Sequence, residues 1–211
     1  MPVGTAYAWH DNDAGQLGIG SYKDSNTPVP SHLPPGTTCI AVAGGQSESL
    51  FATSVGSVYA TGYANRGQLG DNSTVNVTSP VQTSIPPGVR IKSVAAGWDD
   101  AFALSTNGAV YSWGWNIYGQ LGVGTTGKQS NVPVLVHMPS GVRVKAIAAG
   151  KYHVLALTST GGIYAWGSNA FGQLGDNSTT DSNLPVSVQL PVGMAATAIG
   201  AGDGHSLAVT A

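Results

Sequence analysis

The sequence predicts an all-β fold, a β-propeller built from four-stranded blades. Two observations carry this prediction. The tetrapeptide Gly-Gln-Leu-Gly occurs four times at intervals of 52, 52 and 53 residues, and the intervals repeat the same four short extended segments without helical periodicity. A period of about 50 residues is typical of propellers and other tandem arrays, in which each unit buries its apolar surface against its neighbours. We therefore expect four copies of one structural unit in the 211 residues.

The third unit shows the four expected strands most clearly, and they are expected at 133–136, 142–147, 153–158 and 163–167. The first begins with a proline, which suits a strand start or an outer edge. The second alternates apolar and polar side chains, as a half-buried strand does. The pair Gly161-Gly162 between the last two is typical of a tight hairpin turn. Prolines, turn glycines and apolar runs recur in the same order in the other units.

The two ends of the chain are complementary in sequence. The chain opens on the fourth strand of a unit, 5–9, and closes on a third strand, 206–210. The N-terminal strand is therefore expected to complete the C-terminal blade, which removes two open sheet edges that invite aggregation. One propeller or half-propeller domain is expected over 1–211. Its units lie approximately at 19–70, 71–122, 123–175 and 176–211, the last completed by 1–18.

Three arrangements remain open for these ends. Closure within one chain gives a compact ring of four blades, and closure between two identical chains gives an eight-bladed homodimer by strand exchange. The third arrangement is a fragment of a larger ring. Blades shaped for a wide ring would splay if they were forced into a ring of four. We favour the homodimer.

The composition narrows the class of partner. Charged residues make up only 9% of the chain and the net charge is −2, so no positive field gathers nucleic acid or acidic membranes. No apolar run approaches the roughly 20 residues that a membrane-spanning helix needs. We expect neither nucleic acid nor a membrane as partner, and the sequence does not predict a cellular location.

No catalytic constellation is evident in the sequence. A nucleophile elbow needs a strand-to-helix turn, and no helix is expected. In each unit the second strand runs into small residues that end in a glycine, the small-residue glycine, at 45, 97, 150 and 202. The residues three positions after these glycines are Glu48, Asp100, His153 and His205, a set that could ligate a metal. The simpler interpretation is a polar side chain that bonds the backbone of an inner turn. We predict no enzyme, no catalytic residue, no metal and no cofactor.

The third unit resembles the regulator of chromosome condensation repeat in four segments, at 148–153, 155–157, 164–169 and 172–175. The same pattern runs over essentially the whole chain. The resemblance implies a β-propeller. Closed members of this family typically carry seven blades, so four units are a departure. The family includes a nucleotide exchange factor for a nuclear small GTPase and secreted bacterial proteins that bind other proteins. The exchange activity depends on insertions and termini that this chain does not show, and we do not expect it here.

The units differ most at two sets of loop positions. These are the two residues after each small-residue glycine and the four residues before each Gly-Gln-Leu-Gly, which change between aromatic, charged and small types. The resemblance implies that both sets lie at one end of the propeller. Aromatic residues and arginine are typical of interface hot spots, so we expect partner binding there. The residues expected to bind are Trp98, Asp99, Trp115, Tyr118, Lys151, Tyr152, Tyr63, Arg66 and Phe171.

The sequence thus predicts a non-catalytic scaffold whose variable loops recognise a protein. Carbohydrate is the second candidate ligand, because exposed aromatic rings stack on sugars. A purely structural self-assembling module and a hydrolase or metal enzyme with a central site are the alternatives. A second group of aromatic residues occupies fixed repeat positions and is expected to pack between blades. It consists of Trp9, Trp113, Trp166, Tyr59, Tyr111 and Tyr164.

Overall fold

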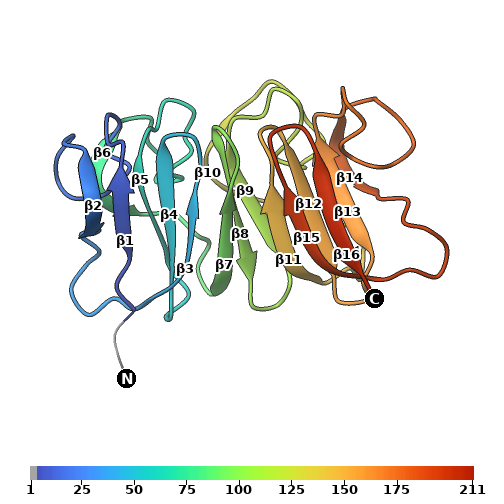
Figure 1. Ribbon diagram of the computed structural model, residues 1–211, viewed down its shortest axis with the longest axis horizontal. Helices are drawn as coiled ribbons and strands as arrows, with labels where there is room; N and C mark the ends of the chain where they lie inside the picture. The colour runs from blue at the N-terminus through green and yellow to red at the C-terminus, as the bar shows by residue number, and fades with distance from the viewer. Residues whose placement is uncertain (1–3) are drawn as a thin grey trace.

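The computed structural model describes residues 4–211, which form sixteen strands joined by turns and loops. The strands make five antiparallel sheets that stand side by side in a row (Figure 1). No helix in this range is long and apolar enough to cross a membrane. The strands are β1 (Tyr7–His10), β2 (Ser25–Pro30), β3 (Cys39–Gly44), β4 (Glu48–Thr53), β5 (Val58–Gly62), β6 (Val77–Gln82), β7 (Ile91–Ala96), β8 (Asp100–Ser105), β9 (Val110–Gly114), β10 (Ser130–Leu135), β11 (Val144–Ala149), β12 (His153–Thr158), β13 (Ile163–Gly167), β14 (Ser182–Ser187), β15 (Ala196–Ala201) and β16 (Ser206–Thr210).

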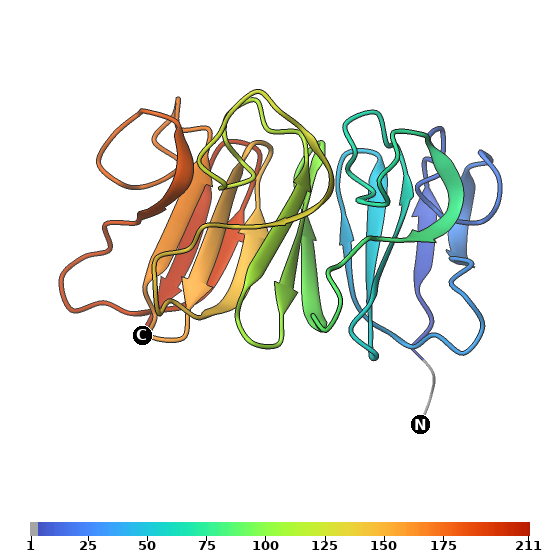
Figure 2. The same cartoon turned by 180° about the vertical axis from the view of Figure 1, so that it is seen from behind.

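Three complete sheets occupy the middle of the row, and a two-stranded sheet stands at each end. The complete sheets have the strand orders β3-β4-β5-β6, β7-β8-β9-β10 and β11-β12-β13-β14. The N-terminal sheet contains β1 and β2, whereas the C-terminal sheet contains β15 and β16. Both views place these two sheets at opposite ends of the molecule (Figures 1 and 2). The expected all-β fold of four-stranded blades is confirmed, in the form of an open row.

Apolar side chains fill the space between adjacent sheets, because successive side chains of a strand point to opposite faces. In β8, Ala101 and Ala103 belong to the core shared with the preceding sheet, whereas Phe102 and Leu104 belong to the core shared with the following sheet. Full burial of a leucine or phenylalanine side chain contributes about 1.5–3 kcal/mol. Each layer of core therefore needs two sheets, and a sheet at the end of the row lacks one of its layers.

Strands β12 and β13 lie where the sequence predicts them. Strand β11 begins two residues later than expected and continues through Ala148 and Ala149. The small residues at its end belong to the strand because successive inner strands contact one another, β7 with β3 and β11 with β7. Small side chains allow this close approach.

The sheets are displaced by one strand relative to the sequence units. The loop that carries each Gly-Gln-Leu-Gly turns the chain back along the strand that it has just left, so that β14 pairs with β13. The first strand of each unit is therefore the outer strand of the preceding sheet. As a correction to the sequence analysis, the C-terminal sheet lacks two outer strands rather than one. Closure within one chain is not observed, since β1 pairs with β2 and β16 pairs with β15 in separate sheets.

The ends of the row expose side chains that the complete sheets bury. Trp113 and Trp166 are 0% exposed, as their fixed repeat position predicts, but Trp9 is 59% exposed at the same position. The expectation that Trp9 packs between blades is therefore wrong for the isolated chain. Trp166 is covered by the preceding sheet and by the inner strand β12, whereas β1 has neither a preceding sheet nor an inner strand. The tyrosines at the other fixed position are half-buried, namely Tyr59, Tyr111 and Tyr164.

Candidate functional site

The first set of variable residues lies in the inner turns, which connect β3 to β4, β7 to β8, β11 to β12 and β15 to β16. The turn after β7 is closed by the N–H of Gly97, which donates to the Asp100 carbonyl oxygen at 2.8 Å. The N–H of Trp98 donates to the Lys151 carbonyl oxygen in the next sheet at 3.3 Å. In the same way, the N–H of Lys151 donates to the Asp203 carbonyl oxygen at 3.2 Å. Main-chain hydrogen bonds therefore tie each inner turn to the next.

The second set lies in the loops before each Gly-Gln-Leu-Gly, and repeated polar side chains support these loops from within. In the third loop, Asn116 Oδ1 accepts a hydrogen bond from the N–H of Leu121 at 3.0 Å, and Gln120 Oε1 accepts one from the N–H of Tyr118 at 3.0 Å. Asn116 and Gln120 are fully buried. The glutamine makes the same bond in all four units. The variable residues are thus carried on loops of one defined shape.

Four aromatic rings from the second and third complete sheets meet where the two sets of loops adjoin. Tyr152 lies at the centre. Its ring stacks on Trp98 with 5.6 Å between centroids and 11° between planes, meets the edge of Trp115 at 5.6 Å, and lies 5.0 Å from Tyr118. Aromatic pairs of this geometry stabilise by about 0.5–1.5 kcal/mol beyond their buried area. Together with two cations they form the aromatic patch, which consists of Trp98, Trp115, Tyr118, Tyr152, Arg66 and Lys151.

The two cations of the aromatic patch lie over the faces of its indoles. Lys151 Nζ is 3.2 Å from the ring centre of Trp98, and the guanidinium carbon of Arg66 is 5.1 Å from that of Trp115. The negative face of an aromatic ring attracts such a charge. Lys151 Nζ also lies 3.9 Å from the exposed Asp203 carboxylate, a pair that solvent screens. The cations hold the indoles in place, and exposed Arg66 keeps donors available to a ligand.

Asp99 adds an acidic group to the edge of the aromatic patch. Its Oδ1 accepts a hydrogen bond from Gln68 Nε2 at 3.1 Å. Burial raises the pKa of Asp99, and the Arg66 guanidinium partly offsets this. Burial also raises the pKa of Tyr152, with further contributions from Tyr118 and nearby carboxyl groups. The Tyr152 phenol is therefore protonated at neutral pH and is able to donate a hydrogen bond.

One geometric relation explains which predicted residues meet. The residue just before each Gly-Gln-Leu-Gly lies beside the second residue of the inner turn in the next sheet. The side chains that meet at each junction are therefore set by two positions that are 33 or 34 residues apart in the sequence. The pairs at three successive junctions are Arg66 with Asp99, Tyr118 with Tyr152, and Phe171 with Gly204.

The structure does not bring Phe171 or Tyr63 into the aromatic patch. Phe171 is 84% exposed, because its neighbour Gly204 has no side chain to pack against. Tyr63 is half-buried, and its hydroxyl accepts a hydrogen bond from Asn65 Nδ2 at 2.8 Å. Neither ring pairs with another aromatic ring within residues 4–211. The other seven predicted residues lie together, namely Trp98, Asp99, Trp115, Tyr118, Lys151, Tyr152 and Arg66.

The polar position three residues after each inner-turn glycine forms a separate series, buried in the complete sheets. Burial raises the pKa of Glu48 and Asp100 well above their usual range and lowers the pKa of His153 to about 4. His153 Nε2 lies 3.0 Å from Ser206 Oγ, which itself donates to the Gln173 carbonyl oxygen, so the imidazole is the donor in the first bond. Each of these side chains packs against the glycine of its own turn. This favours a structural role over a shared metal site.

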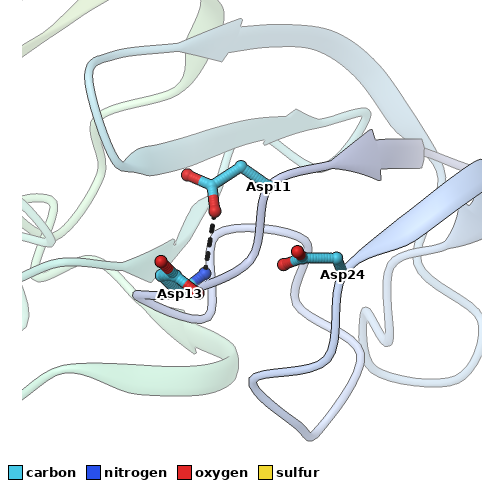
Figure 3. Close-up of side chains that lie close together, drawn as sticks. All are labelled: Asp11, Asp13 and Asp24. Atoms are coloured by element: carbon cyan, nitrogen blue, oxygen red, sulfur yellow. Dashed lines mark hydrogen bonds between the residues drawn. The ribbon is translucent and has the colours of Figure 1, made fainter.

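An acidic cluster that the sequence analysis did not single out lies at the N-terminal sheet (Figure 3). Carboxylate oxygens of Asp11, Asp13 and Asp24 lie within 4.8 Å of one another, and all three residues are exposed. Two of them already accept loop hydrogen bonds, Asp24 from the N–H of Asn12 and Asp11 from Gln16 Nε2, both at 2.9 Å. The only sequence signal is the Asp-x-Asp spacing, which is also common in turns. The cluster supports a loop, and no ligand follows from it.

The chain matches known proteins along its whole length. Residues 3–211 match the model of the RCC1-like domain. The ultraviolet-B receptor UVR8 of Arabidopsis thaliana is 33% identical over 207 residues, which cover 98% of this chain and 47% of the receptor. The human E3 ubiquitin-protein ligase HERC2 is 33% identical over 211 residues, which cover 98% of this chain and 4% of the ligase. The chain therefore spans about half of the first relative and a small part of the second.

Two solved structures share the arrangement of sheets. Human WBSCR16 superposes with a TM-score of 0.87 at 25% identity, over 99% of this chain and 54% of its own. Saccharomyces cerevisiae Prp20p superposes with a TM-score of 0.84 at 23% identity, over 98% of this chain and 52% of its own. The resemblance to the regulator of chromosome condensation repeat is confirmed by the family match and by these relatives. This chain belongs to the RCC1-like domain family of β-propellers.

Proposed function

We propose that this chain is a non-catalytic propeller scaffold that binds a partner protein through the aromatic patch. One observation carries the proposal: loops of three sheets bring four aromatic rings and two cations together at positions where the repeats differ most. Tryptophan, tyrosine and arginine are enriched among the residues that dominate binding energy at protein interfaces. Side chains that served only to pack the blades would follow the repeat, as Trp113 and Trp166 do.

The aromatic patch is organised before a ligand arrives. Three aromatic neighbours hold the Tyr152 ring, and inter-sheet hydrogen bonds hold the turns of Trp98 and Lys151. Binding to a preformed surface loses less conformational entropy than binding to mobile loops. The Arg66 guanidinium is exposed and suits bidentate pairing with a carboxylate. The partner segment is therefore expected to combine an apolar side chain with an acidic one.

Two solved neighbours support protein recognition by this fold. Prp20p was described together with its binding to Gsp1p and histones, and yeast RCC1 was solved bound to Kap60. Those partners belong to those proteins. For the present chain they support only the class of ligand, since its own patch is assembled from residues that vary between its repeats.

A binding titration with matched variants tests this proposal. Capture on the immobilised wild-type chain supplies a candidate partner, and titration of that purified protein gives the affinity. Tyr152→Ala removes the ring that joins the patch and is expected to weaken binding at least about tenfold. Tyr22→Ala, which removes a ring that is 56% exposed elsewhere, is the control and is expected to bind like wild type. Equal affinity of Tyr152→Ala, Trp98→Ala and wild type overturns the proposal.

The same variants separate the other ligand classes. Binding to a glycan array that is lost in Trp98→Ala would replace protein by carbohydrate, because stacked indole and phenol rings also suit sugar rings. A chain that retains neither proteins nor glycans, and still self-associates, would be a purely structural module.

Ultraviolet perception is a second candidate function, and the arrangement of the indoles favours it. The relative from Arabidopsis thaliana is named an ultraviolet-B receptor. In this chain two indoles, Trp98 and Trp115, contact the same Tyr152 ring, and each carries a cation on its face. Irradiation with ultraviolet-B light followed by circular dichroism tests the idea, with Trp98→Phe and Trp115→Phe as variants. A light-induced change of equal size in wild type and both variants contradicts it.

We also propose that the chain self-associates as a homodimer through the open ends of its row of sheets. Open sheet edges are templates for pairing with another chain. Light scattering over a dilution series is expected to show a species near twice 21.3 kDa that dissociates on dilution. A mass of 21.3 kDa at every concentration contradicts self-association.

A further inference from the structure

We propose that two copies of this chain complete each other's end sheets, with β16 of one copy paired with β1 of the other, and so close an eight-bladed ring. This inference rests on the proposed self-association and specifies its geometry. Each copy supplies three complete sheets and two half-sheets. Two copies joined in this way contain six complete sheets and two shared ones, with no half-sheet left over.

The two half-sheets are structurally the two halves of one blade. In the third complete sheet the outer pair has Tyr164 opposite Ser187 and Ala165 opposite Val186. In the N-terminal sheet, Tyr7 lies opposite Pro30 and Ala8 opposite Val29, with a register shift at the same place. The C-terminal sheet repeats the inner pair in the same way, since β15 and β16 pair as β11 and β12 do. Inner and outer halves therefore already have the shape that a complete blade requires.

The complete blades give the register of the shared sheet. In the third complete sheet Val154 lies opposite Trp166 and Leu155 opposite Ala165. The inner-turn glycines Gly150 and Gly202 map β12 onto β16, and the Gly-Gln-Leu-Gly sequences that follow β13 and β1 map these two strands onto each other. The same register places Ser206 opposite Trp9 and Leu207 opposite Ala8 of the second copy. The register makes the proposal specific enough to be tested at single positions.

A cavity beside the C-terminal sheet has the lining that the Trp9 indole needs. Trp166 is fully buried in an apolar cluster, and its Nε1 donates to the Gln120 carbonyl oxygen at 2.8 Å. The corresponding residues beside β16 line a cavity of about 340 Å³. Trp9 of a second copy is the side chain that the repeat places there. The lining residues that correspond to the surroundings of Trp166 are Leu155, Ile163, Leu174, Val188, Gln173 and Gly175.

Side chains on both faces of the proposed junction are exposed in the isolated chain and buried at the matching positions of the complete blades. Leu207 is 63% exposed and Val209 is 61% exposed, whereas Leu155 and Leu157 are 2% and 1% exposed. Trp9 differs from Trp113 and Trp166 in the same way, so these repeat positions are exposed at the ends of the row and buried in its middle. Their burial at two junctions is the driving force for closure.

The complete blades and the proposed junction hold their glycine on different strands of the contact: on the third strand in a complete blade, and in the inner turn at the junction. The third strand of each complete blade ends in a glycine with positive φ, as at Gly167 of β13, where a Cβ would collide with the Tyr152 carbonyl oxygen of the inner turn. The matching residue of β1 is His10, which has a φ of 87°, and the residue that it would face is Gly204 in place of Tyr152. Glycine can turn its carbonyl away at low cost. The two ends are thus fitted to each other.

The hydrogen bonds between inner turns also have complementary ends. In the row, the N–H of each inner turn donates to the next, from Gln46 to Trp98, from Trp98 to Lys151, and from Lys151 to Asp203. The series is extended when the N–H of Asp203 donates to the Gln46 carbonyl oxygen of the second copy. Closure of the ring therefore continues the pattern of main-chain bonds across both junctions.

Disulfide trapping of the register tests the ring. The single cysteine is first removed as Cys39→Ser. Ala8→Cys with Leu207→Cys places two thiols directly opposite each other in the proposed register, at about 5 Å between Cα atoms, which a disulfide spans. Ala8→Cys with Val209→Cys is the control, since a diagonal pair is about 7–8 Å apart. A covalent dimer on a non-reducing gel is expected for the first pair, and little for the second.

Light scattering of the Cys39→Ser chain separates the outcomes. A dimer whose 8–207 pair bridges no better than its 8–209 pair overturns the ring but leaves self-association intact. A monomer at every concentration overturns both. Long polymers with the 8–207 bridge overturn the ring and keep the junction. As a second measurement, Trp9→Ala is expected to weaken the dimer at least about tenfold. The isolated chain should still fold, because Trp9 is 59% exposed in it.

Discussion

Trp166 and Trp9 occupy the same position of the repeat, but the residue is buried in the middle of the molecule and exposed at its end. The indole of Trp166 is 0% exposed and donates to a backbone carbonyl, whereas the indole of Trp9 is 59% exposed. The two residues have the same sequence context, Tyr-Ala-Trp. Burial in a repeat protein therefore depends on whether a neighbouring sheet is present, and less on the residue itself.

The largest expected effect separates these two tryptophans directly. Trp166→Ala leaves a cavity in a packed layer and is expected to lower the free energy of unfolding by about 3–5 kcal/mol. Trp9→Ala is expected to change it by less than about 0.5 kcal/mol under conditions where the chain is monomeric, because nothing packs on its exposed side. Urea unfolding of dilute samples measures both. A loss of similar size in the two variants would mean that the ends are packed like the middle.

The second effect concerns a buried histidine of the middle sheets. The pKa of His153 is lowered to about 4, below its ordinary value near 6.5. The unfolded chain therefore takes up a proton first, and the free energy of unfolding is expected to fall as the pH drops from about 6.5 to about 4, by up to about 3 kcal/mol. The raised pKa values of Glu48 and Asp100 act in the opposite sense. These carboxyl groups hold their protons more tightly in the folded chain, so their contribution to the free energy of unfolding falls as the pH rises.

The difference between wild type and His153→Gln isolates the histidine. Glutamine retains a donor for Ser206 Oγ but does not titrate. The difference in unfolding free energy is expected to vary over this pH range and to be constant above it. A pH-independent difference would show that the imidazole is as accessible to protons when folded as when unfolded.

A third and smaller effect concerns the fit between His10 and Gly204. In the isolated chain a Cβ at Gly204 would make ordinary contact with Phe171 at 3.6 Å, so Gly204→Ala is expected to fold. At the proposed junction the His10 Cβ faces the carbonyl oxygen of residue 204, which alanine turns away less readily than glycine, so dimer affinity is expected to fall about tenfold, or 1.4 kcal/mol. His10→Gly is expected to restore it in the double variant. Sedimentation equilibrium measures the dimer affinity of the single and double variants. Additive losses would refute the fit between His10 and Gly204.

The smallest expected effect lies in the aromatic patch. Lys151→Met keeps the aliphatic stem and removes the charge that lies 3.2 Å from the Trp98 ring centre. The loss in unfolding free energy is expected to be about 0.5–1 kcal/mol, as for cation–π pairs near solvent. Urea unfolding is the measurement, with Lys145→Met, exposed on β11, as control. Equal changes in the two variants would leave the Lys151 charge without a role.

The sequence predicted the features that depend on neighbours along the chain. The strands at 153–158 and 163–167 follow from apolar runs on both sides of a glycine turn, and they lie as predicted. The partner of β14 could not be predicted in the same way, because it depends on how the preceding loop folds. In that loop, Asn169 bonds to residues 9–11 positions ahead and brings the chain back beside β13.

The candidate site also has one part that the sequence predicts and one part that depends on contacts between sheets. Variation between repeats identified the loop positions that meet in the aromatic patch, since only a surface tolerates such changes. It could not show that Phe171 stays apart, because that depends on the residue opposite in the next sheet. Tyr118 finds Tyr152 there, whereas Phe171 finds Gly204.

The direction of the hydrogen bonds between inner turns has a consequence for assembly. Every donor in the series points toward the C-terminal sheet, so the row has a head and a tail. Units that join head to tail grow into a helical filament unless their curvature returns the last tail to the first head. Once one junction has formed, the second is an intramolecular event at millimolar effective concentration. Small changes in blade angle therefore decide between a finite particle and a polymer, and dilution favours the particle.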